Sequence, residues 1–102
     1  MTAPVFTEQV VMTPGTVGGK PRIAGTRIRV HDVVIWHLER GRSISEIVSE
    51  IFPAITEAEA YAALSFYYDN RELIEEIMER EEHFEEEFRA EFPHLVAPPL
   101  HE

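Results

Sequence analysis

The stretch SISEIVSEIFPAITEAEAYAALSFYYDN, residues 43–70, contains two helix starts in close succession. In both SISE, residues 43–46, and TEAE, residues 56–59, a hydroxyl residue precedes a glutamate by three positions. Such a pair predicts a capping box, because each side chain can accept a hydrogen bond from the other residue's backbone N–H. Phe52-Pro53 lies between the two starts and ends the first helix. The stretch therefore predicts two short helices joined by a tight turn, as in a helix-turn-helix unit.

The spacing of apolar residues supports both helices and predicts one more before them. The first helix has the i, i+3, i+4, i+7 pattern of an amphipathic helix at Ile44, Ile47, Val48 and Ile51. The segment VHDVVIWHLERG, residues 30–41, also has apolar residues at helical spacing, and Gly41 is a natural C-terminal cap. We expect three short helices between residues 30 and 70.

A compact basic segment, GGKPRIAGTRIRV at Gly18–Val30, precedes these helices. Arg22-Ile23 and Arg27–Val30 flank a turn, and the alternation of RIRV places arginines on one face and apolar residues on the other. We therefore expect a small β-hairpin here, and a further short strand at Val10–Met12. The candidate DNA-binding residues lie in and just after this segment: Lys20, Arg22, Arg27, Arg29, Arg40 and Arg42.

Two alternatives remain for these cations, because the chain as a whole carries a net charge of −10. They can contact phosphates, or they can face solvent and pair with the chain's own glutamates or with a second subunit. The predicted second helix of the helix-turn-helix begins TEAEAYAAL and offers no Arg, Lys, Asn or Gln to read base edges. Base recognition through that helix is therefore disfavoured.

Beyond residue 70 the composition becomes glutamate-rich, and RELIEEIMEREEHFEEEFRAEF, residues 71–92, favours a helix. We expect a β-arm plus helix-turn-helix domain at 1–70, and an acidic amphipathic helical extension with a loose tail at 71–102. An apolar stripe along the extension either packs on the domain or a second copy, or docks into a partner's basic groove. It supplies the candidate partner-binding residues Leu73, Ile77, Phe84, Phe88 and Phe92.

Several function classes are disfavoured by what the sequence lacks. GTVGGK, residues 15–20, is one residue short of a phosphate-binding loop and is followed by proline instead of a hydroxyl residue. The chain has no cysteine, and its five histidines show no metal-ligand spacing. No apolar run approaches the roughly 20 residues that span a bilayer, and the N-terminus does not resemble a signal peptide. We expect a cytoplasmic protein without cofactor, metal or catalytic activity.

The segment from GGKPRIAGTRIRV through SISEIV, FPAIT and the alanine-rich helix resembles a family of small bacterial proteins, the domain of unknown function numbered four hundred and thirty-three. The resemblance covers about residues 8–70. It implies a homeodomain-like fold that is mainly α, with short N-terminal strands before a three-helix core. Within that core it implies a helix-turn-helix at 43–68, with Gly25-Thr26-Arg27 as the hairpin signature. It also implies that the protein is an antitoxin, encoded beside a PIN-like toxin of the metal-dependent RNase class.

Charge leads independently toward the same function. An RNA-binding cleft is positively charged, so a glutamate-rich helix with aromatic anchors can occupy it. We expect a homodimeric antitoxin that neutralises a PIN-like toxin through residues 71–96, with DNA-binding autoregulation as an additional role. Two alternatives remain: a helix-turn-helix DNA-binding regulator without a toxin, and a structural dimer whose phenylalanines form a self-interface.

Overall fold

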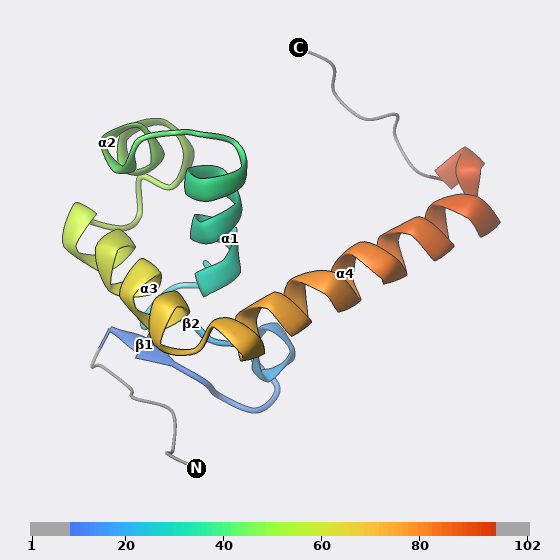
Figure 1. Ribbon diagram of the computed structural model, residues 1–102, viewed down its shortest axis with the longest axis horizontal. Coiled ribbons are helices and arrows are strands. Elements are labelled where there is room, and N and C mark those ends of the chain that lie inside the picture. The colour runs from blue at the N-terminus through green and yellow to red at the C-terminus, as the bar shows by residue number, and fades with distance from the viewer. Residues whose placement is uncertain (1–8, 96–102) are drawn as a thin grey trace.

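A computed structural model describes residues 9–95 of the chain, which are mainly helical (Figure 1). Residues 1–8 and 96–102 lie outside the described residues, and with them most of the predicted tail at 94–102. No helix within 9–95 is both long and apolar enough to cross a membrane. The elements are β1 (Val10–Val11), η1 (Val17–Gly19), β2 (Arg22–Ile23), α1 (Val30–Val34), η2 (Ile35–Glu39), α2 (Ile44–Glu46), η3 (Ile47–Ile51), α3 (Glu57–Asp69), α4 (Arg71–Glu91) and η4 (Pro93–Leu95).

The two strands form an antiparallel pair in which Val10 lies opposite Ile23. Short N-terminal strands are thus confirmed, but the main partner of β2 is β1, whereas the sequence predicted residues 27–30. That second arm contributes a single bridge, between Arg22 and Arg29. It stops there because the Asp32 carboxylate accepts the backbone N–H of Arg29 at 2.9 Å, which turns the chain into α1 at Val30.

The three predicted short helices are present, and the first two widen at their C-terminal ends. α1 runs directly into η2, a π-helical turn in which the Arg40 N–H bonds the Ile35 carbonyl at 2.9 Å. α2 runs into η3 in the same way, with the Phe52 N–H on the Ile47 carbonyl at 2.7 Å. Gly41 follows the first helix with φ +69°, a conformation that favours glycine.

Both predicted capping boxes form. The Ser43 hydroxyl accepts from the Glu46 N–H at 3.1 Å, and the Glu46 carboxylate accepts from the Ser43 N–H at 2.9 Å. At the start of α3, Thr56 and Glu59 make the same reciprocal pair at 3.1 and 2.9 Å. These bonds satisfy N–H groups that a helix start leaves without partners, so both helix starts are encoded locally.

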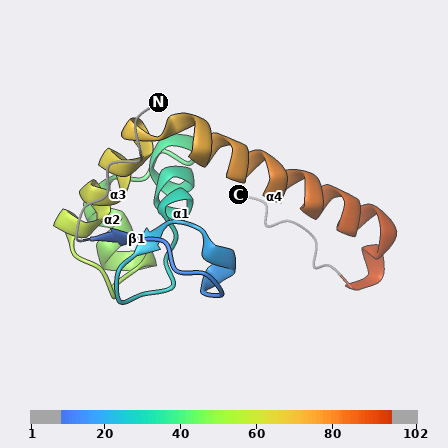
Figure 2. The same cartoon turned by 90° about the horizontal axis from the view of Figure 1, so that it is seen from below.

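The core lies between α1, α2 and α3, with the β-strands beneath them (Figures 1 and 2). Ile23, Val33, Ile47 and Phe66 contribute from four different elements and are at most 1% exposed. The chain passes from α3 to α4 at Asn70, which is where the sequence placed its domain boundary. The core nevertheless continues across that point, because Ile74 of α4 is fully buried within it.

Candidate functional site

The helix α4 has a first half that packs on the core and a second half that projects away from it (Figure 1). Ile74 and Ile77 are buried, and the Tyr67 hydroxyl of α3 donates to the Glu75 carboxylate at 2.8 Å. From residue 82 onward, every described side chain of α4 is exposed. The candidate partner-binding residues are divided accordingly: Leu73 and Ile77 belong to the core face, and the three phenylalanines do not.

Those phenylalanines, Phe84, Phe88 and Phe92, form a continuous exposed row that we call the Phe stripe. Their exposed fractions are 68%, 38% and 37%. Neighbouring rings touch, with centroids 6.2 Å apart for Phe84 and Phe88 and 5.1 Å apart for Phe88 and Phe92. Spacings of four residues keep the rings on one side of the helix. The stripe is therefore an apolar surface that no described part of the chain covers.

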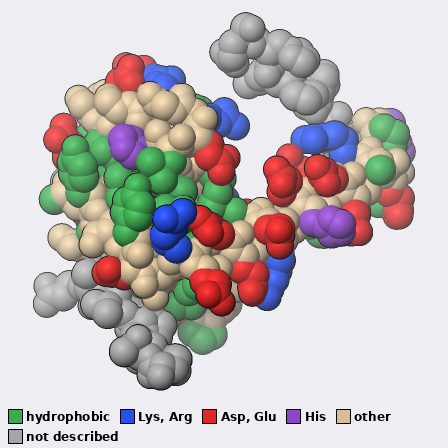
Figure 3. Space-filling view, viewed as in Figure 1, with side chains coloured by type: hydrophobic (Ala, Val, Ile, Leu, Met, Phe, Trp, Pro, Cys, Tyr) green, Lys and Arg blue, Asp and Glu red, His purple; other side chains and the backbone are tan. Residues whose placement is uncertain are grey.

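The projecting half of α4 is held as a helix by pairs one turn apart. Arg80 bonds Glu76, His83 lies 3.1 Å from Glu87, and Arg89 lies 3.0 Å from Glu85. Each of the two Arg–Glu pairs adds about 0.2–0.5 kcal/mol to an exposed helix. α4 as a whole contains ten glutamates against three arginines. The helix therefore presents the Phe stripe within a strongly negative surround, and Figure 3 shows acidic side chains gathered along it.

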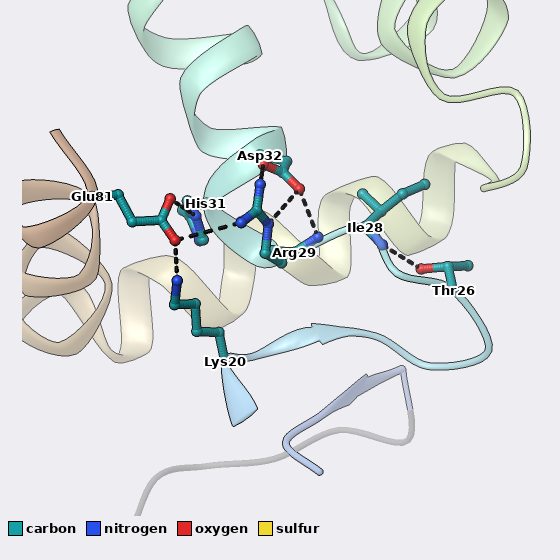
Figure 4. Close-up of polar contacts among 7 residues, drawn as sticks. All are labelled: Lys20, Thr26, Ile28, Arg29, His31, Asp32 and Glu81. Atoms are coloured by element: carbon teal, nitrogen blue, oxygen red, sulfur yellow. Dashed lines mark hydrogen bonds and ion pairs between the residues drawn. The ribbon is translucent and has the colours of Figure 1, made fainter. Parts of the chain in front are cut away.

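At the point where α4 leaves the core, Glu81 joins three cationic or polar side chains that are far away in the sequence (Figure 4). Its carboxylate bonds Lys20, lies 3.4 Å from the Arg29 guanidinium, and accepts a hydrogen bond from His31 Nε2 at 2.9 Å. Partial burial by itself raises the pKa of Glu81, but the hydrogen bond from Lys20 and its other two partners outweigh burial and hold that pKa below its ordinary value. Glu81 therefore fixes the direction in which α4 leaves the core.

Arg29 belongs to the same network, and its guanidinium is occupied within the chain. It bonds the Asp32 carboxylate through Nε at 3.1 Å and through Nη2 at 3.0 Å. The hydrogen bond to Asp32 raises the pKa of Arg29, against the opposing effect of burial. Arg29 is therefore a structural residue that connects the start of α1 to α4.

The structure separates the other candidate DNA-binding residues by what they contact. Arg42 pairs with Glu50 at 2.9 Å and with Glu46 at 3.5 Å. The Arg40 guanidinium lies 4.6 Å from the centre of the Trp36 ring, in cation–π geometry.

The remaining two candidate DNA-binding residues, Arg22 and Arg27, lie in or next to the turn of the basic segment. Arg22 is partly buried and donates to the Thr13 hydroxyl at 3.3 Å. Arg27 is exposed and makes no ion pair within residues 9–95. Two of the four cations of the basic segment, Lys20 and Arg29, therefore pair with the chain's own acids, whereas Arg22 and Arg27 make no ion pair within residues 9–95.

A groove of about 490 Å³ lies between η2 and the middle of α4. Its walls contain His31, Ile35, Glu39 and Arg40 on one side, and Glu75, Met78, Glu79, Glu81, Glu82 and Glu85 on the other. Neither the groove nor the network at Glu81 leaves a pattern in the sequence, because the two groove walls come from separate helices and the residues that Glu81 bonds lie 50 or more positions away. One signal was available: Glu81 interrupts the apolar face of α4, four residues after Ile77 and three before Phe84.

Comparison with known proteins gives a family without an assigned activity. The family model described as Protein of unknown function (DUF433) matches residues 10–67. A solved structure, a crystal structure of a DUF433 member protein from Anabaena variabilis ATCC 29413, is 32% identical with a TM-score of 0.61. The match covers 67% of this chain and 65% of that one, so about a third of the solved chain has no counterpart here. No curated protein matches. The matched region contains the strands, the first helices and most of α3, and this chain belongs to the DUF433 family.

Proposed function

We propose that this chain is an antitoxin: a binding protein without catalytic activity that neutralises a PIN-like RNase by docking the projecting half of α4 onto it. The observation that carries the proposal is the Phe stripe, three touching aromatic rings exposed on an acidic helix. Soluble proteins rarely leave a contiguous apolar surface uncovered unless it binds something. An amphipathic helix with anchors at i, i+4 and i+8 is a common way to occupy a partner's groove.

Burial of these rings adds to the free energy of binding a partner. Full burial of a phenylalanine side chain contributes about 1.5–3 kcal/mol, and Phe84, which is 68% exposed, has the most surface left to bury. Ordering costs are small because the pairs Arg80–Glu76 and Arg89–Glu85 already hold the helix. The helix can therefore bind as a preformed element.

The negative charge of α4 favours a basic partner over a second copy of the chain. A second copy would place one strongly negative helix against another, and this repulsion opposes the self-interface alternative. A basic, RNA-binding surface carries the opposite charge to the helix and therefore attracts it at long range. We therefore favour an RNase active-site cleft as the partner surface over a second copy of the chain.

Within this proposal, the residues before α4 form a homeodomain-like scaffold in which α2–η3 and α3 are the helix-turn-helix. DNA reading is the weaker function for it. The first turn of α3 presents Glu57 and Glu59, which repel phosphates, and Lys20, Arg29 and Arg42 already have acidic partners. Arg27 alone remains an exposed cation of the turn. Any DNA contact would therefore be secondary to protein binding.

The test is co-expression with the product of the adjacent gene, followed by affinity capture. Wild type is compared with a variant carrying Phe84→Ala, Phe88→Ala and Phe92→Ala. A matched control carries Tyr61→Ala and Tyr68→Ala, which remove aromatic rings that are 56% and 55% exposed on α3. We expect wild type and the tyrosine control to retain the partner and the phenylalanine variant to lose it.

Two results would contradict the proposal. One is retention of the partner by the phenylalanine variant. The other is that no form of the chain binds a partner, while light scattering shows wild type as a dimer and the phenylalanine variant as a monomer. That second result would assign the Phe stripe to a self-interface.

A further inference from the structure

We propose that Glu81 is a positioning residue for partner recognition: it holds the Phe stripe at one orientation to the core and so selects a partner that contacts both. This inference rests on the proposed function, because it concerns the same partner. Among residues 9–95, Glu81 is the last residue of α4 that bonds the core, and from residue 82 onward every described side chain of the helix is exposed. The carboxylate therefore lies where the core half of the helix ends and the free half begins.

Three groups from separate parts of the chain hold the Glu81 carboxylate (Figure 4). Lys20 and the Arg29 guanidinium meet its Oε2, and His31 Nε2 donates to its Oε1 at 2.9 Å. His31 is 1% exposed, and Arg29 is itself bonded to Asp32, so these two partners cannot follow a movement of the helix. Hydrogen bonds depend on direction, whereas apolar contacts do not. The network therefore fixes an angle that the apolar contacts of α4 alone would leave free.

Small movements at Glu81 become larger movements of the Phe stripe. Ile77 is the last buried side chain of α4, and Glu81 lies four residues beyond it, about 6 Å along the helix axis. Phe88, the middle ring of the stripe, lies about 16 Å beyond Ile77. A sideways shift of about 1 Å at Glu81 therefore moves Phe88 by about 3 Å. Loss of the network would spread the stripe over a range of positions.

The chain contains two unfavourable features that accompany this network. Glu81 lies on the apolar face of α4, between Ile77 and Phe84, where an apolar residue would continue the stripe. Lys20 follows a turn in which Val17 has φ +43°, a left-handed conformation that is strained for a β-branched residue. Strained backbone is found mainly where function requires a defined geometry. Because buried isoleucines already attach α4 to the core, the network adds direction rather than attachment.

A fixed orientation matters to a partner only if that partner touches the core as well as the Phe stripe. Figure 3 shows an open angle between the projecting half of α4 and the core, so a protein bound to the helix is brought alongside the core. The second contact adds affinity only when its distance and angle from the first are fixed. A basic protein of another shape cannot make both contacts. Glu81 thus contributes to the choice of partner.

The orientation of α4 is measured on the full chain by pulsed electron paramagnetic resonance. Because the chain has no cysteine, Ser49→Cys on η3 and Ala90→Cys on α4 provide two unique sites for spin labels, and both residues are exposed. Glu81→Gln and, from the other side of the contact, Lys20→Met should each broaden the distance distribution. The control Glu86→Gln, the same change of charge at an exposed position of α4, should leave it unchanged. All forms are compared under conditions in which circular dichroism shows the same helix content.

Affinity for the adjacent gene product is then measured on the unlabelled chains. If about one molecule in five keeps the productive orientation, affinity falls about fivefold, which is the loss we expect for Glu81→Gln and for Lys20→Met. The double variant should lose no more than either single variant, because both changes remove the same contact. Glu86→Gln should lose about twofold or less. A residue that only stabilises the fold would leave distances and affinity unchanged in chains that remain folded.

Three results would overturn the inference. An unchanged distance distribution in Glu81→Gln and Lys20→Met would mean that apolar contacts alone fix the orientation. A broadened distribution with undiminished affinity would mean that the partner touches the Phe stripe alone. An equal loss of affinity in Glu86→Gln would mean that the total charge of the helix, and not its orientation, is what the partner recognises.

Failure of the proposed function gives a different result. If no form of the chain captures the adjacent gene product, the antitoxin proposal fails and the choice of partner by Glu81 fails with it, whereas the distance distributions still show whether Glu81 positions the helix. If wild type captures that protein, the phenylalanine variant does not, and Glu81→Gln binds as tightly as wild type, only the positioning role fails.

Discussion

Replacing Ile74 by alanine tests whether α4 begins inside the core. Ile74 is 0% exposed, and the substitution removes three buried carbons. At about 0.8 kcal/mol per carbon the lost burial is roughly 2.4 kcal/mol. The cavity left behind brings the total to about 3–4 kcal/mol, within the usual range for such changes. For a domain of this size that loss lowers the thermal midpoint by roughly 10–20 °C.

The matched substitution is Phe84→Ala on the same helix. Phe84 is 68% exposed, so its loss should change the free energy of unfolding by no more than about 0.5 kcal/mol. Alanine is also the better helix former, which offsets the small packing loss. The measurement is urea unfolding of both variants, followed by far-ultraviolet circular dichroism. Equal destabilisation by the two substitutions would refute the division of α4 into a core half and a free half.

Three further predictions follow from local contacts. Because folding lowers the pKa of Glu81, the ionised carboxylate stabilises the folded chain above the unfolded pKa, and this stabilisation is lost as the pH falls. Wild type should therefore have a higher thermal midpoint than Glu81→Gln at neutral pH, and the two midpoints should converge in acid. Convergence at neutral pH would count against the Glu81 network. Removing either helix cap, by Ser43→Ala or Thr56→Ala, should cost about 1 kcal/mol in urea unfolding, and no loss would contradict the capping boxes. Arg27→Ala should leave stability unchanged whereas Arg29→Ala lowers it, and thermal scans that show the reverse would contradict their assigned contacts.

Features encoded by near neighbours in the sequence could be predicted. The capping boxes of Ser43 and Thr56 depend on a partner three residues away, so their pattern is complete within a short window. The same holds for the turn at Gly41 and for the apolar spacing of the short helices. These features fixed the helix order, which the structure confirms.

Features that depend on long-range contacts could not be predicted. Residues 71–92 were expected to form an acidic amphipathic helix, but Glu81 within that helix bonds Lys20 from 61 positions away, and no local pattern records that pairing. The β-hairpin shows the same limit, because β2 pairs mainly with β1 and only a single bridge reaches Arg29. The apolar stripe was correctly identified, but only packing reveals that its first part is core and its second part exposed.

This division of the stripe also determines how the extension should be tested. A chain cut after residue 70 would lose Ile74 and Ile77 from the core together with the exposed rings. Its failure to bind a partner would then reflect unfolding as much as a missing surface. Point substitutions in the Phe stripe avoid that ambiguity.

The proposed neutralisation of an RNase by the Phe stripe is tested most directly by an inhibition assay. The purified product of the adjacent gene is assayed for RNA cleavage while the chain is titrated in. We expect wild type to abolish cleavage, and the variant with Phe84→Ala, Phe88→Ala and Phe92→Ala to fold normally and leave cleavage intact. Inhibition by that variant as strong as by wild type would contradict the claim.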